Sequence, residues 1–330
     1  MKIKFLQNII DKIRKKHNYI PFYNKSNNYI NFDKKPMYEN QYKVIFDSFS
    51  EQKVLTIVMQ GPIIYKDNFT LETLKLYKKT FYNCPIILST WDYEDNKTIK
   101  NIEKLGVIVI KNTPPEKKGL GNINYQIKST KEGLKKAKEL GSSYVIKTRT
   151  DQRFYETHIV EYLFNLMQMY PKDAQNIKQK ERLFTLSFNT FKYRLYDITD
   201  MFLFGNIDDV IEYWNCDYED REIFPQWHTL LDYCKIEPCE IGVCIQYLKR
   251  IGHIPNFTLK DSWECYSKYF CIIDASSLRL YWPKYTNDAF RFRNFIGKEP
   301  FLEELTYKEW LSLYLKNKKI IPEEMLNQKY

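Results

Sequence analysis

The sequence predicts an α/β fold in which a mainly parallel sheet is flanked by helices. Three observations predict it: short apolar runs alternate with helical patterns between residues 54 and 151, glycines end two of these patterns at Gly106 and Gly141, and polar residues follow every apolar run. Strands that alternate with helices are typical of right-handed βαβ units, whose strands are parallel. With 330 residues, of which 44% are hydrophobic, the chain can bury a packed core.

The first half of the chain contains four predicted strands, and a helix follows each of the first three. The strands are VLTIVMQ (54–60), PIILSTW (85–91), VIVIKN (107–112) and YVIKTRTD (144–151), and the helices span 68–82, 95–105 and 122–140. Leu71, Leu74 and Tyr77 form an apolar stripe on the first helix. This regular order predicts that all four strands belong to one parallel sheet.

The second half is less regular, and we expect a loop-rich mixed α+β part there. Helical patterns cover 159–169, 207–214 and 240–251, and apolar runs at 183–188 and 200–205 predict strands. No internal repeat or low-complexity tract separates the two halves. We therefore predict a single domain over 53–330.

Residues 1–52 are predicted to be an amphipathic helix followed by a connector. Apolar residues fall on one helical face and basic residues flank it: Phe5, Leu6, Ile9, Ile10 and Ile13, with Lys2, Lys4, Lys12, Arg14, Lys15 and Lys16. Such a helix either lies on the anionic inner leaflet of a membrane or packs on its own domain. Residues 17–52 are rich in Asn, Tyr, Lys and Pro without a sustained period, so they form the connector.

The net charge and the cysteines of the chain limit the classes of binding partner and the cellular compartment that we expect. A net charge of +10 favours a polyanionic partner, such as nucleic acid, an acidic membrane face or a phosphorylated substrate. The sequence has no RNA-binding signature, zinc-finger spacing or helix-turn-helix pattern, so we expect no nucleic acid. It has no apolar run of about 20 residues and no secretion signal. Seven irregularly spaced cysteines indicate reduced thiols, so we expect a cytoplasmic protein, with peripheral contact to the inner membrane as the alternative given by the first helix.

Polar residues follow all four predicted strands of the first half, at the point where each strand ends. They are Gln60-Gly61-Pro62, Ser89-Thr90-Trp91-Asp92, Lys111-Asn112, and Lys147 with Arg149 and Asp151. Ligands of open α/β sheets bind beyond the carboxyl ends of the strands, so we expect these groups to line one site. Their convergence carries more weight than any single motif.

Each of these motifs also has a purely structural interpretation. Gly61 either makes a tight turn or lets the backbone approach a base or ribose, to which Gln60 would hydrogen bond. Trp91 belongs either to the core or to the site. Three amides near a helix start either cap the helix or hold phosphate oxygens and sugar hydroxyls: Asn122, Asn124 and Gln126.

A charged cluster ends the fourth predicted strand. Lys147, Arg149, Asp151 and Arg153 alternate along the end of this strand, so we expect their side chains to share one face. Three cations around one acid form either a solvated ion-pair cluster or a site that neutralises a diphosphate. Because three other polar strand ends lie beside it, we favour the diphosphate site.

Five motifs occur in a fixed order along residues 54–215: QGPI (60–63), STW (89–91), GNINYQIKSTKEGL (121–134), KTRTDQR (147–153) and TDMFLFG (199–205). As a set they resemble the WavE family of lipopolysaccharide synthesis proteins, which is similar to glycosyltransferases of the GT-A type. The resemblance implies a GT-A-like (Rossmann-type) fold, with a nucleotide-sugar-binding half over 53–155 and an acceptor half over 156–330. It further implies a bacterial enzyme that moves a sugar from a nucleotide sugar to a lipopolysaccharide-core, lipooligosaccharide or capsular glycan, carried on a lipid-linked or oligosaccharide acceptor.

The resemblance also implies roles for individual residues. Gln60 and Thr90 would line the nucleotide pocket, while Asn122, Asn124 and Gln126 would face the donor. Asp151 would correspond to the last aspartate of an Asp-x-Asp motif, the residue that usually touches Mg²⁺ or Mn²⁺. Arg149 stands where the first aspartate of that motif would be, which agrees with the Arg-Thr-Asp of the family. The metal dependence stays open, because a single carboxylate binds Mg²⁺ weakly.

An inverting sugar transfer needs a carboxylate that deprotonates the acceptor hydroxyl. Asp200, at the start of an apolar run, and Glu240, at the start of a helical pattern where Glu is also a good first-turn residue, are the candidates. Two other functions are open. A sugar nucleotidylyltransferase would want a glycine-rich, arginine-containing loop after the first strand, where this chain offers only Gly61. A non-catalytic glycan-binding protein would not need acids and cations at the strand ends.

Overall fold

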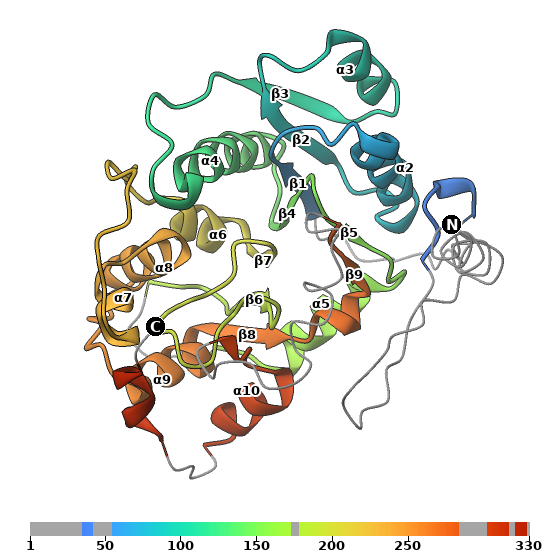
Figure 1. The fold of residues 1–330 in the computed structure, drawn as a ribbon. Helices are drawn as coiled ribbons and strands as arrows, with labels where there is room; N and C mark the ends of the chain where they lie inside the picture. Colours follow the sequence, from blue (N-terminus) through green and yellow to red (C-terminus); the bar gives the residue numbers. More distant parts are fainter. Residues whose placement is uncertain (1–34, 42–54, 173–177, 284–301, 317–320, 329–330) are drawn as a thin grey trace, which may run out of the picture. The chain divides into compact units, whose positions relative to one another are not determined.

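The computed structural model describes residues 35–41, 55–172, 178–283, 302–316 and 321–328 (Figure 1). The predicted amphipathic helix and most of the connector lie outside these residues. The described residues from 37 onwards form one compact unit. The predicted domain boundary at residue 53 falls outside the described residues, and the division into two halves at residue 155 likewise stays a prediction.

A seven-stranded sheet forms the centre of the fold (Figure 1). Its order is β3-β2-β1-β4-β7-β6-β8, made from β1 (Leu55–Gln60), β2 (Ile86–Trp91), β3 (Ile108–Asn112), β4 (Tyr144–Arg149), β6 (Leu183–Leu186), β7 (Leu203–Asn206) and β8 (Phe270–Ile273). The first four strands are parallel, β7 runs antiparallel to both of its neighbours, and β6 is parallel to β8. The predicted α/β fold, with a mainly parallel sheet and a mixed C-terminal part, is confirmed.

The register of the parallel strands brings their polar ends to one edge of the sheet. Gln60 is paired with Ser89 on β2 and with Arg149 on β4, while Trp91 is paired with Asn112 on β3. Because these strands run in the same direction, their carboxyl ends all lie at the same edge. The convergence predicted from the sequence is confirmed for these backbone positions.

Helices cover both faces of the sheet (Figure 1). They are α2 (Phe69–Thr80), α3 (Asn96–Glu103), α4 (Ile123–Glu139), α5 (Ile159–Met169), α6 (Ile207–Trp214), α7 (Leu230–Lys235), α8 (Cys239–Arg250), α9 (Leu259–Tyr269) and α10 (Tyr307–Tyr314). Side chains alternate along β4, which distinguishes the two faces. Tyr144 packs on Phe164 of α5, whereas Lys147 lies over the ring of Trp214 of α6. Lys147 and Arg149 therefore share the face that α6 covers.

Helix α4 lies very close to the sheet on that same face. A Cβ atom on Gly133 would come within 2.4 Å of Val58 Cγ1 and within 3.3 Å of Ser89 Cβ. Side chains in a packed core cannot move away from such a contact without cost, so only glycine lets α4 rest at this depth on β1 and β2. The depth matters because the first turn of α4 carries Gln126.

Some elements end earlier, or begin later, than the sequence predicts. β4 ends at Arg149 and a turn follows, β6 ends at Leu186, and β7 begins at Leu203. After the turn, the chain forms the short strand β5 (Arg153–Phe154), which pairs with β9 (Leu280–Tyr281) in a second sheet. The break after β4 decides where Arg153 lies.

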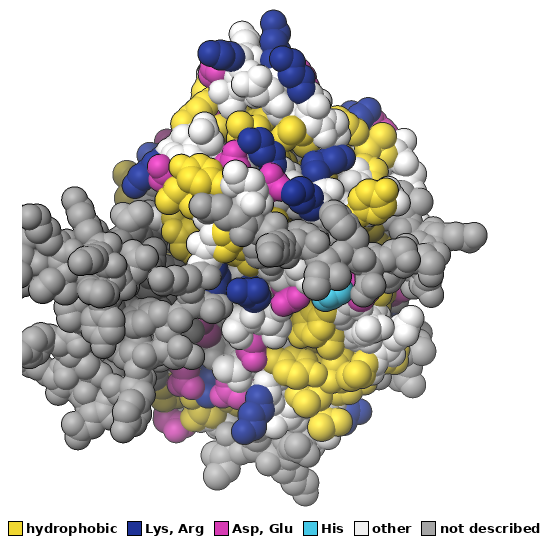
Figure 2. Space-filling view, turned by 90° about the vertical axis from the view of Figure 1, so that its right-hand side faces the viewer, with side chains coloured by type: hydrophobic (Ala, Val, Ile, Leu, Met, Phe, Trp, Pro, Cys, Tyr) yellow, Lys and Arg dark blue, Asp and Glu magenta, His cyan; other side chains and the backbone are white. Residues whose placement is uncertain are grey.

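The surface of the first half is basic. On the face shown in Figure 2, Lys and Arg side chains gather over the upper part, where Figure 1 places α2 and α3. Helix α3 and the residue after it expose Lys97, Lys100 and Lys104. This surface accords with the net charge of the chain.

All seven cysteines are free, as predicted for reduced thiols, and only Cys84 and Cys239 are not buried. In the part of the chain that the structure describes, no helix has the length and apolar character that crossing a bilayer requires. The core instead consists of the sheet and the apolar faces of the surrounding helices.

Candidate active site

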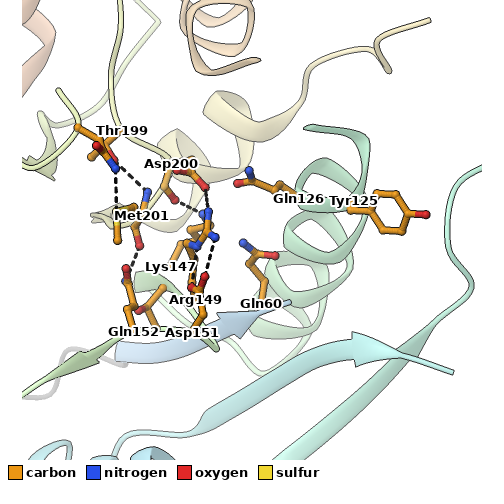
Figure 3. A network of polar contacts seen from close by, with 12 residues as sticks. Gln60, Tyr125, Gln126, Lys147, Arg149, Asp151, Gln152, Thr199, Asp200 and Met201 are labelled. Carbon is orange, nitrogen blue, oxygen red and sulfur yellow. Dashed lines mark hydrogen bonds and ion pairs between the residues drawn. The ribbon is translucent and has the colours of Figure 1, made fainter. Parts of the chain in front are cut away.

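The candidate active site lies at the carboxyl edge of β1 and β4, beside the first turn of α4, which carries Gln126 (Figure 3). β4 and the turn after it supply Lys147, Arg149 and Asp151, and the segment before β7 supplies Asp200. The start of α8 is held next to the start of α4, because Cys239 Sγ donates to the carbonyl of Leu120 at 3.2 Å. Segments from both halves of the chain therefore build the site.

Arg149 holds two carboxylates in place. Its Nε and Nη2 atoms donate to the two oxygens of Asp151, each at 2.9 Å, and its Nη1 atom donates to Asp200 Oδ2 at 2.5 Å. The Arg149 side chain is 15% exposed and that of Asp200 only 6%. Charge-assisted, bidentate hydrogen bonds are among the stronger ones in proteins. The three residues form one fixed unit, which we call the Arg149 cluster.

Lys147 lies beneath the Arg149 cluster and is fully buried. Its Nζ atom donates to the backbone carbonyl of Asp200 and lies 4.6 Å from the centre of the Trp214 ring. Burial lowers the pKa of Lys147 to about 8, although the charge of Asp200 acts in the opposite direction. Lys147 thus fixes the backbone at Asp200, and the expectation that it contacts a donor directly is corrected by its burial.

The two predicted base candidates, Asp200 and Glu240, have opposite pKa shifts. Burial alone would raise the pKa of Asp200, but the charges of Arg149 and Lys147 outweigh it and lower this pKa. Burial, followed by the charges of Asp200 and Asp197, raises the pKa of Glu240 to about 8. Asp200 is therefore a permanent anion near neutral pH. Glu240, half-buried on the first turn of α8, can gain or lose a proton there.

Two glutamine side chains lie at the margin of the Arg149 cluster (Figure 3). Gln60 Oε1 accepts from Ser129 Oγ of α4 at 2.8 Å, so this side chain ties β1 to α4. Gln126 points its carboxamide towards Asp200, whereas the neighbouring Tyr125 points away. Gln126 Oε1 is buried and has no hydrogen-bond partner among the described residues. Buried acceptors are normally satisfied, so this atom is free to accept a further hydrogen bond.

Glu94, which sequence reasoning missed, holds the loop after β1 against the end of β2. Its carboxylate accepts from the backbone N–H of Ile63 at 2.8 Å, from Thr90 Oγ1 at 3.0 Å and from Tyr65 Oη at 2.5 Å. Thr90 therefore donates to Glu94. Its predicted place in the lining of a nucleotide pocket stays a prediction. The available signal was an acid close behind the STW motif, at the strand end where polar residues already collect.

Gly61 and Trp91 follow their structural interpretations. Gly61 has a φ of +119°, and a Cβ atom there would lie 2.8 Å from Thr150 Oγ1. Glycine is thus needed for packing against the turn after β4. Trp91 is 2% exposed and packs edge-on against Tyr125, with ring centres 5.1 Å apart. Contact of either residue with a donor stays a prediction.

The three predicted amides near the start of α4 have different positions. Asn124 is 1% exposed, its Nδ2 donates to the carbonyls of Lys117 and Glu219, and its Oδ1 accepts from Glu219 N. It fastens the loop before α4 to the loop after α6, which corrects the expectation that it faces the donor. Asn122 is exposed and forms no capping hydrogen bond with α4. Of the three, Gln126 points into the site.

Arg153 lies apart from the Arg149 cluster, which corrects the prediction that it shares a face with the three preceding charged residues. Because β4 ends at Arg149, the alternation of side chains is broken at the following turn. Arg153 is buried and donates to Thr73 Oγ1 at 2.8 Å and to the carbonyl of Phe69 at 3.0 Å. It anchors α2 on the opposite face of the sheet.

Comparison with models of protein families shows to which family the chain belongs. The sequence model described as WavE lipopolysaccharide synthesis matches residues 55–250, a region that contains β1 to β4, Asp200 and Glu240. The chain belongs to the WavE lipopolysaccharide synthesis family. The resemblance carried by its five motifs is thus confirmed, and the candidate site of this WavE-family protein lies within the matched region.

Solved structures similar to this WavE-family chain are distant. A cytidylyltransferase from Leptospira borgpetersenii is 15% identical with a TM-score of 0.37, and the match covers 84% of this chain and 99% of that one. A protein provisionally named as a nucleotide-diphospho-sugar transferase, from Desulfovibrio desulfuricans, is 9% identical with a TM-score of 0.33, and the match covers 61% and 77% of the two chains. No curated protein matches the chain.

In this WavE-family protein, the carboxylates of Asp151, the predicted metal ligand, and of Asp200 are already bound to an arginine. Both oxygens of Asp151 accept from Arg149, and Asp200 is bound to the same guanidinium. Within the described ranges, no two further His, Cys, Asp or Glu side chains join Asp151 in a cluster of potential metal ligands. An ion there would have to share its carboxylate with Arg149. Binding of Mg²⁺ or Mn²⁺ by Asp151 stays a prediction, and no chemical step is derived from it.

Proposed function

We propose that this protein is a glycosyltransferase that moves a sugar from a nucleotide sugar to a hydroxyl of a lipopolysaccharide-core, lipooligosaccharide or capsular glycan. The observation that carries the proposal is the fixed Arg149 cluster at the carboxyl edge of the sheet. Glu240 lies on the first turn of α8, where burial and the charge of Asp200 raise its pKa to about 8. Transfer with inversion needs a base for the acceptor hydroxyl and a cation for the leaving diphosphate. Membership of the WavE family supports a glycan acceptor.

Glu240 is the proposed general base. Its raised pKa makes the ionised form a stronger base than an ordinary glutamate, and a useful fraction is ionised between about pH 7 and 8. Asp200 is less suited to this role, because Arg149 holds it and lowers its pKa. We assign Asp200 to positioning Arg149. If the enzyme retains the configuration of the sugar, neither carboxylate acts as this base.

The donor diphosphate is proposed to lie between Arg149 and the start of α4. Three of the five N–H groups of Arg149 are used on Asp151 and Asp200, and the other two are proposed to donate to phosphate oxygens. The positive end of the α4 dipole favours the same anion. Gln126 Oε1, which lacks a donor in the described structure, would accept from a sugar hydroxyl. These contacts neutralise the charge that develops on the leaving group.

The acceptor and the membrane are proposed to approach from the basic surface. Exposed Lys97, Lys100 and Lys104 attract phosphorylated or acidic glycans and anionic lipid headgroups. The protein is accordingly proposed to act in the cytoplasm, in peripheral contact with the inner membrane face. The turn after β1 gives no support to a nucleotidylyltransferase, since its one glycine is packed against Thr150.

The proposal is tested first by donor binding. A panel of nucleotide sugars is screened for thermal stabilisation of the full-length chain, with and without Mn²⁺, and a true donor stabilises by about 2.7 kcal/mol at 100 times its Kd. The same donors are then followed for release of a nucleoside diphosphate, which a glycosyltransferase produces. A nucleotidylyltransferase instead releases pyrophosphate from a nucleoside triphosphate. If no nucleotide sugar stabilises the chain, the proposal is wrong.

The second test uses Asp151→Ala, with Asp208→Ala on α6 as its control. Asp151 contributes to the Arg149 cluster, whereas Asp208 pairs with Lys138 and Lys180 and is 40% exposed. We expect donor hydrolysis and transfer to be lost in the first variant and retained in the second. Equal activity of both variants would place the chemistry elsewhere.

A further inference from the structure

Three side chains of metal-ligating type meet at the opposite end of α8 from Glu240. His253 follows the C-terminus of α8, and Asp261 and Cys265 belong to α9. One ligand atom from each residue lies within 4.8 Å of the other two. Nowhere else in the described residues do three His, Cys, Asp or Glu side chains come together in this way. We call this group the His253 cluster.

Two of the ligand-atom distances in the His253 cluster are close to those around a zinc ion, and the third lies within 4.8 Å. Asp261 and Cys265 are four residues apart, so they lie on one face of α9. His253 Nε2 is 3.2 Å from Asp261 Oδ1 and 3.2 Å from Cys265 Sγ. Zinc bonds of about 2.0 Å to N or O and 2.3 Å to S place tetrahedral ligand atoms roughly 3.3–3.6 Å apart. Small side-chain movements would therefore bring these atoms into a zinc coordination sphere.

Neighbouring hydroxyl groups orient two of the three ligands. Tyr269 Oη lies 3.3 Å from His253 Nδ1, which directs Nε2 of the imidazole towards the centre of the cluster. Tyr196 Oη donates to Asp261 Oδ2 at 2.6 Å, so the carboxylate is fixed with both of its oxygens 3.2 Å from His253 Nε2. Metal-binding histidines and carboxylates in proteins have outer partners of this kind.

We infer that His253, Asp261 and Cys265 form a zinc-binding site that fastens the end of α8 to α9. A set of nitrogen, oxygen and sulfur ligands suits Zn²⁺, whereas Mg²⁺ and Mn²⁺ prefer oxygen ligands. The His253 side chain is 19% exposed and Cys265 only 1%, so an ion would enter from the histidine side and keep a water molecule as its fourth ligand. The inference does not rest on the proposed glycosyltransferase function.

Charge balance supports an ion in this place. The only ion-pair partner of Asp261 among the described residues is His253, and that pair is charged only when the imidazole is protonated. A divalent cation bound by one carboxylate and one thiolate gives a neutral centre, which a partly buried position favours. Without an ion, the same side chains are a hydrogen-bonded group in which His253 Nε2 donates to Asp261. The experiment must separate these two states.

The direct test is metal binding by the full-length, untagged chain after it has been stripped with a chelator. We expect calorimetric titration to show one Zn²⁺ bound per chain. Co²⁺ added in its place should produce the near-ultraviolet charge-transfer absorption of a cobalt–thiolate bond. A chain that binds no stoichiometric Zn²⁺, or whose Co²⁺ spectrum lacks the thiolate band, overturns the inference and leaves the hydrogen-bonded group.

Matched variants assign the ligands. Cys265→Ser should lose the cobalt–thiolate band and weaken Zn²⁺ binding by at least about 10-fold. Cys271→Ser, which changes a cysteine of similar burial on β8, should keep both. His253→Gln alters a more exposed residue and should also weaken Zn²⁺ binding, so it gives the same readout if Cys265→Ser does not fold. Wild-type Zn²⁺ affinity in both His253→Gln and Cys265→Ser would contradict the assignment.

Discussion

The two polar clusters at opposite ends of α8 treat their buried carboxylates differently. In the Arg149 cluster, a guanidinium lies between Asp151 and Asp200 and donates to both. In the His253 cluster, Asp261 faces an imidazole and a thiol, and no Lys or Arg pairs with it among the described residues. Buried anions need a counter-charge. The chain itself carries that charge at one end of the helix, while at the other end the ligands are arranged for an ion from solution.

The comparison also clarifies what the Arg-Thr-Asp sequence does. The arginine of this sequence lies between two carboxylates and donates to both, and as a covalent part of the chain it cannot dissociate. As a result, three of its five N–H groups are used on the two acids. The site gains a cation of fixed position, which suits stabilisation of a leaving group.

Removing the built-in cation should have the largest effect. Arg149→Ala leaves Asp151 and Asp200 close together without their counter-charge, so we expect a loss of about 3–5 kcal/mol in the free energy of unfolding, measured in urea, and no detectable transfer. Arg149→Lys keeps the charge but loses the bidentate geometry. Its unfolding free energy and its transfer activity should lie between those of the wild type and Arg149→Ala. A stable, active Arg149→Ala protein would break the comparison, because the cation would then be dispensable.

The next largest effect is expected on the reaction rate when Glu240, the proposed base, is replaced. Glu240→Gln should lower kcat by about 10²–10⁴-fold if Glu240 is the base. The wild-type rate should rise with pH up to a plateau above about pH 8, following ionisation of Glu240, and the residual rate of the variant should lack this limb. The same pH limb in both proteins would assign the proton transfer to another group.

The free energy of unfolding should fall as the pH rises, in contrast to the reaction rate, which should increase. The folded-state pKa of Glu240 is raised above that of the unfolded chain, about 4.3. Its contribution to stability is therefore fully present below this value and is lost as the pH rises through about 8. The unfolding free energy of the wild type should accordingly fall relative to that of Glu240→Gln across this window. Urea unfolding at several pH values measures this difference.

A smaller loss of stability is expected for Asn124→Ala, which tests whether Asn124 holds loops together or faces the candidate site. Asn124→Ala removes three hydrogen bonds between the loops that flank α4 and α6. We expect a loss of about 1–3 kcal/mol in stability, because buried backbone groups lose their partners. The KM for the donor should change little at a temperature where the variant is folded. A change in KM without a loss of stability would restore Asn124 to the donor site.

The smallest effect on stability, and a selective effect on binding, is expected for Gln126→Ala. Gln126 Oε1 forms no hydrogen bond in the described structure, so the free energy of unfolding should stay within about 0.5 kcal/mol of the wild type. The KM for the donor should rise several-fold, because a sugar hydroxyl loses its acceptor. Asn124→Ala and Gln126→Ala thus form a reciprocal pair, and identical behaviour of the two would contradict their different roles.

The regular first half of the chain was predictable from the sequence. Four apolar runs and three amphipathic patterns specify β1 to β4 and the helices between them, and the parallel order then places their polar ends together. The positions of Gln60, Arg149 and Asp151 at one edge follow from this order. Local periodicity is sufficient because each βαβ unit is formed by neighbouring residues.

Contacts between distant segments were not predictable in the same way. The sequence indicates neither that Asp200 pairs with Arg149 nor that Asn124 bonds to Glu219, since neither contact leaves a periodic pattern. Arg153 was misplaced because the end of β4 could not be located to within two residues. The His253 cluster was missed because its ligands come from a loop and a helix, without the C-x-x-C spacing of common zinc sites.

Helix α4 packs closely on the sheet, and under the proposed function this restricts how the protein can come to accept a different nucleotide sugar. Since the Cβ of any other residue at position 133 would collide with Val58, the height of α4 cannot be tuned in small steps. Under the proposed function, variation in the accepted sugar is expected to come from side chains exchanged on a helix of fixed position, such as Gln126. Selection for altered donor preference should enrich changes on that first turn, whereas Gly133 should stay unchanged in every surviving clone.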